Sequence, residues 1–136
     1  MKPAKKIKIG NARTFHNLKS TQAAEKDPNG LNQHDKGSKL DAHKPRLGLV
    51  LGDFGNALLA VGEVGTFGAE KYTDHGWLSV ENGKERYTDA LLRHQVKEGL
   101  GEEVDEDSGL LHAAHTAWNA LAKLELQLRD TKGEQQ

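Results

Sequence analysis

The segment from residue 110 to about residue 129 has the pattern of one helix with two different faces, and it constrains the fold more than any other feature. One face is apolar at every third or fourth position, with Leu110, Ala114, Ala117, Leu121, Leu124 and Leu128. On a helical wheel, His112, His115 and Asn119 fall within about 60° of one another on the opposite side. Buried polar groups need partners, so this second face predicts a site as well as a packing surface.

Two more helices are predicted, over residues 54–72 and 84–100, because their apolar residues recur at helical spacing. Asp53 is a candidate N-cap for the first of them, and Ser108 for the helix near residue 110. No stretch alternates apolar and polar residues for long enough to indicate a sheet. The expected fold is all-α, a bundle of about three main helices. Three short helices cannot cover both faces of the third, so we expect oligomerisation to complete the bundle.

The charge of the chain is unevenly distributed. Residues 1–46 contain 11 Lys/Arg and 4 Asp/Glu, which gives +7, and the remainder contains 8 and 16, which gives −8. We therefore expect a basic, poorly ordered arm over residues 1–43, a helical domain over residues 44–129 and a polar tail over residues 130–136. Basic arms are more often solvated than bound to nucleic acid, and no aromatic pattern indicates a nucleic-acid reader, so nucleic acid is an unlikely partner.

Several classes of protein are excluded by simple counts. The chain has no cysteine, which excludes disulfides and cysteine-based zinc sites. No apolar run approaches the roughly 18 residues that a membrane-spanning helix needs. The basic N-terminal residues are not followed by the apolar core of a signal peptide. A cytoplasmic protein without membrane association is the expectation.

Three histidines are the candidate catalytic residues. His112 and His115 are neighbours on one helical face, and His94 lies on the preceding helix. An unperturbed imidazole titrates near pH 6.5, so each could accept a proton from water. The alternative is a set of core imidazoles that are hydrogen-bonded to backbone carbonyls, and the spacing leaves both interpretations open.

Carboxylates near these histidines are the candidate metal ligands. Glu98 shares a helical face with His94, and an acidic linker follows directly. The full candidate set is Glu63, Glu98, Glu102, Asp105 and Asp107. Such oxygen ligands suit Mg²⁺ or Mn²⁺. The acidic linker could equally be a solvated turn, and Glu63 could simply face solvent.

A second group of side chains could contact a substrate. Arg93 and Lys71 are suited to phosphate oxygens, as a guanidinium fork and a point charge respectively. Tyr72 and Trp77 could stack on a base, or they could anchor a loop at the end of the bundle. Asn119 could orient a histidine or bind the edge of a base.

Taken in order, several separate elements form a recognisable pattern. They are Lys44-Pro45-Arg46, Thr66-Phe67-Gly68-Ala69-Glu70-Lys71-Tyr72, Trp77, Arg86-Tyr87, Ala90-Leu91-Leu92-Arg93-His94, Gly101-Glu102-Glu103-Val104-Asp105, Ser108-Gly109-Leu110, and His112 and His115 with Asn119. The pattern covers residues 44–125. It resembles the phage-associated dATP/dGTP diphosphohydrolase family (MazZ-type, N-terminal domain), a relative of the all-α MazG-like NTP pyrophosphohydrolases.

The resemblance implies a metal-dependent hydrolase that splits a purine deoxynucleoside triphosphate (dATP or dGTP) into monophosphate and pyrophosphate. It also implies a helical dimer or tetramer that holds Mg²⁺ or Mn²⁺ between helices, phage-encoded and acting in the host cytoplasm. Under this interpretation the carboxylates hold the metals and a histidine takes the proton of the attacking water. Arg93 and Lys71 then steady the phosphates.

The chain departs from the wider MazG-like group in one respect. It lacks the Glu-Glu-x-x-Glu motif, and Glu102-x-x-Asp105 lies in a linker while His112-x-x-His115 occupies the helix. Two alternatives therefore stay open. One is a zinc-dependent phosphohydrolase built on His94, His112 and His115 with a carboxylate. The other is a non-catalytic phage accessory protein that binds a nucleotide or a host partner.

Overall fold

The computed structural model describes residues 24–133, and the side chains of residues 131–133 are not described. The chain divides into two units, Met1–Pro45 and Arg46–Gln136. Most of the expected basic arm and the end of the expected polar tail lie outside the described residues. The proposed division at residues 43 and 129 therefore stays a prediction.

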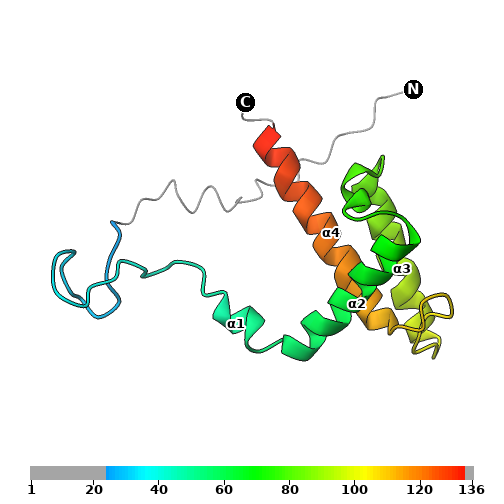
Figure 1. The fold of residues 1–136 in the computed structure, drawn as a ribbon, viewed down its shortest axis with the longest axis horizontal. Helices are drawn as coiled ribbons and strands as arrows, with labels where there is room; N and C mark the ends of the chain where they lie inside the picture. Colours follow the sequence, from blue (N-terminus) through cyan, green and yellow to red (C-terminus); the bar gives the residue numbers. More distant parts are fainter. Residues whose placement is uncertain (1–23, 134–136) are drawn as a thin grey trace, which may run out of the picture. The chain divides into compact units, whose positions relative to one another are not determined.

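Within the described residues the fold is all-α, as the sequence predicts (Figure 1). The elements in order are α1 (Gly48–Leu51), α2 (Gly55–Lys71), the short 3₁₀ helix η1 (Gly76–Ser79), α3 (Gly83–Gly99) and α4 (His112–Gly133). The one β feature described is an isolated antiparallel bridge between Val104 and Leu111. No helix in the described range is both long and apolar enough to cross a membrane.

The helix α4 packs along α3 and also contacts α2 (Figure 1). The loop between α3 and α4 is tight, because Gly101 and Gly109 both adopt positive φ angles, +94° and +69°, that favour glycine. Backbone hydrogen bonds then close it: the Asp105 N–H donates to the Leu110 carbonyl, and the His112 N–H donates to the Glu103 carbonyl. The loop thus returns the chain directly to the first turn of α4.

The two faces of α4 have different environments. The polar face is turned inward, with His112 fully buried and His115 and Asn119 buried beside it. The apolar face is largely open, since Leu121 is 52% exposed and Leu124 is 51% exposed. The buried apolar side chains of the described residues are few and small, namely Val64, Ala114 and Ala122.

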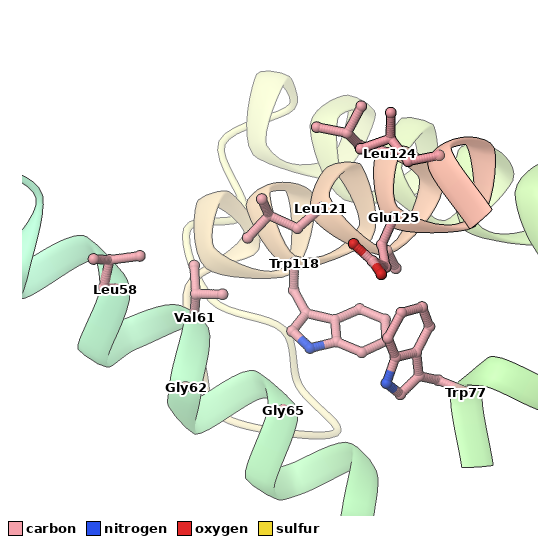
Figure 2. A pocket seen from close by; sticks show the side chains of 11 residues that line it. Leu58, Val61, Gly62, Gly65, Trp77, Trp118, Leu121, Leu124 and Glu125 are labelled. Carbon is pink, nitrogen blue, oxygen red and sulfur yellow. The ribbon is translucent and has the colours of Figure 1, made fainter. Parts of the chain in front are cut away.

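The open face of α4 forms one wall of an apolar groove against α2 (Figure 2). The groove has a volume of about 450 Å³ and is lined by Leu58, Val61, Gly62, Gly65, Trp77, Trp118, Leu121, Ala122, Leu124, Glu125 and Leu128. Trp77, Trp118 and Tyr87 pack edge-to-face with ring centroids 5.7–6.3 Å apart. The Tyr87 hydroxyl donates to the Trp77 carbonyl at 2.7 Å, which fixes η1 against α3.

Both predicted N-caps are wrong. The residue before α2 is Phe54, and no side chain caps this helix. The Phe54 N–H donates to the Val50 carbonyl, so the chain passes from α1 to α2 through one continuing helical turn that leaves no capping position for Asp53. Ser108 lies four residues before the first residue of α4, and its hydroxyl donates a hydrogen bond to the Asp105 carboxylate.

The described part of the first unit, residues 24–45, is organised around one carboxylate. Asp27 is buried and accepts backbone N–H groups from Asn29 at 2.7 Å, Leu31 at 3.4 Å and Lys39 at 2.8 Å. The hydrogen bond from Lys39, together with those from Asn29 and Leu31, lowers the pKa of Asp27 against the opposing effect of burial. The Asp27 carboxylate therefore stabilises both the turn at residues 27–31 and the longer loop that ends at Lys39.

Candidate functional site

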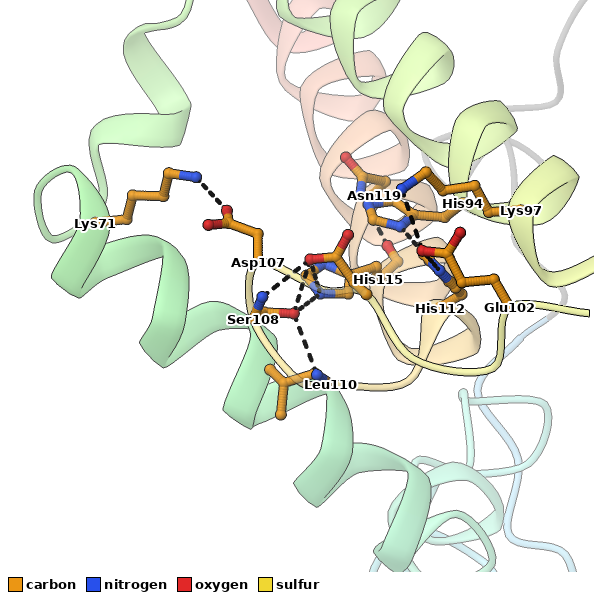
Figure 3. A network of polar contacts seen from close by, with 11 residues as sticks. Lys71, His94, Lys97, Glu102, Asp107, Ser108, Leu110, His112, His115 and Asn119 are labelled. Carbon is orange, nitrogen blue, oxygen red and sulfur yellow. Dashed lines mark hydrogen bonds and ion pairs between the residues drawn. The ribbon is translucent and has the colours of Figure 1, made fainter.

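Three imidazoles meet between α3 and α4 (Figure 3). The Nδ1 atoms of His94 and His112 are 2.8 Å apart, and the two ring centroids are 5.1 Å apart. The His94 ring is also stacked on the His115 ring, with centroids 4.4 Å apart and planes 9° apart. Phe67 on α2 and His115 form an edge-to-face pair, with centroids 6.4 Å apart. The three histidines predicted from sequence therefore form one cluster.

Glu102 orients His112 from the loop side. Its Oε1 atom lies 3.1 Å from Nε2 of His112, and Lys97 approaches the same oxygen at 3.2 Å. The Glu102 carboxylate is the charged group that lies against the buried Nε2 atom of His112. The contacts with His112 and Lys97 hold the pKa of Glu102 below its usual value. Nε2 of His112 thus faces a carboxylate while Nδ1 faces His94.

Asp105 and Ser108 approach the cluster from the same loop. The Ser108 N–H and O–H both donate to Oδ2 of Asp105 at 3.1 Å. The Ser108 Oγ atom is 2.7 Å from Nε2 of His115, and it accepts the Leu110 N–H at 3.2 Å. Both Ser108 bonds end on Oδ2, so Oδ1 of Asp105 receives neither.

The donor set fits a divalent metal ion. His94, Asp105 and His112 each offer a ligand atom, and these atoms all lie within 4.8 Å of one another. Two imidazoles and one carboxylate suit transition metals such as Mn²⁺ or Zn²⁺ better than Mg²⁺, which prefers oxygen ligands throughout.

The other carboxylates predicted as ligands are placed differently. Glu102 contacts the cluster through His112. Asp107 forms an ion pair with Lys71. Glu63 on α2 and Glu98 on α3 have exposed side chains and are not part of the set that converges among the described residues.

The residues predicted to contact substrate lie in several environments. Lys71 is exposed at the end of α2, over the Phe67 and Tyr72 rings, and its ion pair with Asp107 raises its pKa. Tyr72 is 75% exposed. Arg93 is exposed and directly follows Leu92 on the helix that carries His94, and Trp77 lies in the aromatic cluster. Buried Asn119 donates to the His115 carbonyl at 2.8 Å, so its amide nitrogen has a partner within α4.

Burial favours the neutral form of two histidines of this cluster, His94 and His115. Burial, with the neighbouring His115 ring, lowers the pKa of His94 from 6.5 to about 4, although Asp105 opposes the shift. Burial also lowers the pKa of His115. Burial raises the pKa of Asp105, but the hydrogen bonds from Ser108 more than offset this and leave it below its usual value. Neutral imidazoles beside an ionised carboxylate can bind a metal or accept a proton.

We predict that the protein in metal-free buffer loses stability as the pH falls from about 6.5 towards 4. In this window the unfolded chain binds a proton at His94 and the folded chain does not, so the stability present above pH 6.5 is lost on acidification. The site is partly open to solvent, so we expect a loss on the order of 1–2 kcal/mol. Urea unfolding at several pH values measures it. The His94→Gln variant should show a shallower slope over the same range, and an unchanged slope would contradict the prediction.

Comparison with known proteins gives one family match. A family model described as dATP/dGTP diphosphohydrolase, N-terminal, matches residues 34–136. The match covers all of α1 to α4 and every residue of the histidine cluster. No curated protein matches the chain, and no solved structure does.

Proposed function

Because the chain belongs to the dATP/dGTP diphosphohydrolase N-terminal family, we propose that it hydrolyses a purine deoxynucleoside triphosphate to the monophosphate and pyrophosphate. The family description is that of a hydrolase acting on such nucleotides. The observation that carries the proposal is the convergence of His94, Asp105 and His112 within 4.8 Å, beside a third, neutral histidine. Phosphoryl chemistry needs such a place, where negative charge is neutralised and a proton is accepted.

In this proposal His94, Asp105 and His112 hold a divalent ion. A bound ion would neutralise phosphate oxygens and lower the pKa of a coordinated water. Between the two ions that the family resemblance implies, the nitrogen donors favour Mn²⁺ over Mg²⁺. Glu102 serves this set indirectly, since a carboxylate that faces one ring nitrogen of a ligating histidine orients the ring.

The remaining residues of the cluster would handle the proton and the phosphates. His115 is the proposed proton acceptor, because it is neutral and is held in place by the rings of His94 and Phe67. Lys71 is exposed beside the loop that carries Asp105, and phosphate oxygens could replace Asp107 as its partner. We propose that Arg93 adds a second cation and that Tyr72 and Trp77 contact the base.

A panel of nucleotides tests the proposal. Each dNTP and NTP is incubated with Mg²⁺, Mn²⁺ or Zn²⁺, and monophosphate, diphosphate, pyrophosphate and orthophosphate are separated. We expect pyrophosphate from purine dNTPs, and a large loss in Asp105→Asn but not in Asp53→Asn, an exposed aspartate between α1 and α2. No turnover of any nucleotide with any of the three metals would reject the hydrolase and leave a nucleotide-binding accessory protein.

A zinc-dependent phosphohydrolase is the second candidate, and the nitrogen-rich donor set favours it. His94, His112 and Asp105 converge and the His115 ring lies against that of His94, so the cluster offers imidazoles and a carboxylate, the ligand types typical of zinc. Metal analysis of the purified protein distinguishes this zinc enzyme from the purine dNTP hydrolase proposed first. Stoichiometric zinc that survives dialysis supports this candidate, whereas metal-free protein that is activated by added Mn²⁺ supports the first.

We propose that a second copy of the chain covers the open face of α4. The small buried apolar set of Val64, Ala114 and Ala122 is far too little to stabilise a domain of this size alone. The exposed Leu121 and Leu124 continue the apolar stripe along the groove. A helix from a second copy would bury these leucines in the way that helical bundles do.

A further inference from the structure

The Ser108 hydroxyl contacts three different polar groups at the edge of the histidine cluster (Figure 3). Its oxygen is 3.1 Å from Oδ2 of Asp105, 2.7 Å from Nε2 of His115 and 3.2 Å from the backbone nitrogen of Leu110. Ser108 and Asp105 are half-buried and His115 is buried, so each of these contacts replaces contact with water.

The hydrogen-bonding capacity of a hydroxyl allows one arrangement of the protons. A serine oxygen carries one proton and two lone pairs. The Leu110 N–H can only donate, so it occupies one lone pair. The ionised Asp105 carboxylate can only accept, so it takes the serine proton. One lone pair is left for His115, and Nε2 must therefore donate its own N–H to Ser108.

The opposite arrangement is unfavourable. If the serine proton pointed to Nε2 of His115, a lone pair of Oγ would face a carboxylate oxygen of Asp105 at 3.1 Å with no proton between them. Rotation of the imidazole by half a turn would keep the ring plane but place a carbon where Nε2 now lies, so the 2.7 Å contact with Ser108 would be lost. Ring and hydroxyl are therefore fixed together.

We infer that Ser108 is a positioning residue that links the Asp105 carboxylate to His115 through hydrogen bonds and holds this histidine as its Nε2–H tautomer. The nitrogen that carries the free lone pair is then Nδ1. The hydrogen bond at one ring nitrogen selects the tautomer and so decides which nitrogen acts as the base. The consequence that Nδ1 takes the proton in hydrolysis rests on the proposed function, whereas the tautomer itself does not.

Nitrogen NMR of the histidine rings tests the tautomer directly. The full-length chain with ¹⁵N-labelled histidine is measured in metal-free buffer near pH 7.5, and the His115 signals are assigned by their loss in His115→Gln. We expect a protonated Nε2 and an unprotonated Nδ1 in the wild type. A protonated Nδ1 would overturn the inference.

Substitution of Ser108 adds a second test. Ser108→Ala should shift His115 to a mixture of tautomers, while Ser108→Thr, which keeps the hydroxyl, should preserve the wild-type pattern. Ser79→Ala, at an exposed serine of η1, is the matched control and should change nothing. An unchanged His115 tautomer in a folded Ser108→Ala protein would contradict the inference that Ser108 selects the tautomer. If the Ser108→Ala protein does not fold, the wild-type and Ser108→Thr spectra still show whether His115 is the Nε2–H tautomer.

Turnover separates this inference from the proposed function. In an active enzyme, Ser108→Ala should lower kcat by about 10- to 100-fold and change KM by less than about 2-fold, with most of the activity recovered in Ser108→Thr. An Nε2–H tautomer in a protein that hydrolyses no nucleotide would reject the function and support the inference. Hydrolysis together with an Nδ1–H tautomer of His115 would support the proposed function and reject the inference.

Discussion

Replacement of His112 by alanine is expected to lower turnover by about 10³-fold or more and to abolish tight binding of Mn²⁺. His112 is fully buried, its Nδ1 atom is 2.8 Å from Nδ1 of His94, and its Nε2 atom faces Glu102. Alanine at this position would leave the cluster without the nitrogen that lies opposite His94. Steady-state pyrophosphate release and titration calorimetry measure the two losses.

Two further variants make this result specific. His34→Ala removes an exposed histidine of the first unit and should leave both turnover and metal binding unchanged. His112→Asn retains a polar side chain in the buried position, so that a loss of activity can be separated from a loss of folding by circular dichroism. Turnover close to that of the wild type in a folded His112→Asn protein would show that the cluster is not the catalytic centre.

The second large effect is expected at the open face of α4, where Leu124→Glu should convert an oligomer into monomers. Leu124 is 51% exposed in the single chain and lines the apolar groove. A carboxylate buried there without a partner would weaken association by about 100-fold or more, which corresponds to roughly 3 kcal/mol. Sedimentation velocity over a range of protein concentrations measures the change.

The matched control is Gln127→Glu, which adds the same charge at an exposed position of α4 that does not line the groove. It should leave the oligomer intact. A wild-type chain that is monomeric at micromolar concentration, or a Leu124→Glu chain that associates as the wild type does, would show that a second copy does not cover this face.

The three main helices could be predicted because each has an apolar period that extends over several turns. Expected ranges of 54–72 and 84–100 compare with Gly55–Lys71 and Gly83–Gly99 in the structure. The four-residue helix α1 was not predicted, since one turn is too short to show a period. The N-cap prediction at Asp53 is wrong because α2 follows another helical turn, which the sequence did not indicate, and not a loop.

The histidine cluster could be predicted in part. His112 and His115 share a helical face, and sequence spacing alone predicts that they lie together. The position of Asp105 against them could not be predicted, because it depends on how the α3–α4 loop folds around Gly101 and Gly109. Ser108 was missed as part of the site, although a serine three residues after an aspartate and just before a helix was a usable signal. Glu98 illustrates the limit of spacing, since it follows His94 by one turn and still has an exposed side chain.

The tight loop between α3 and α4 has a consequence for how quickly the site assembles. His94, Asp105 and His112 all belong to one helical hairpin, so the chain needs to close only a short loop to bring them together. Short loops close in about 10–100 ns and contacts between nearby residues favour rapid folding. We expect the hairpin to bring these three residues together before α2 docks.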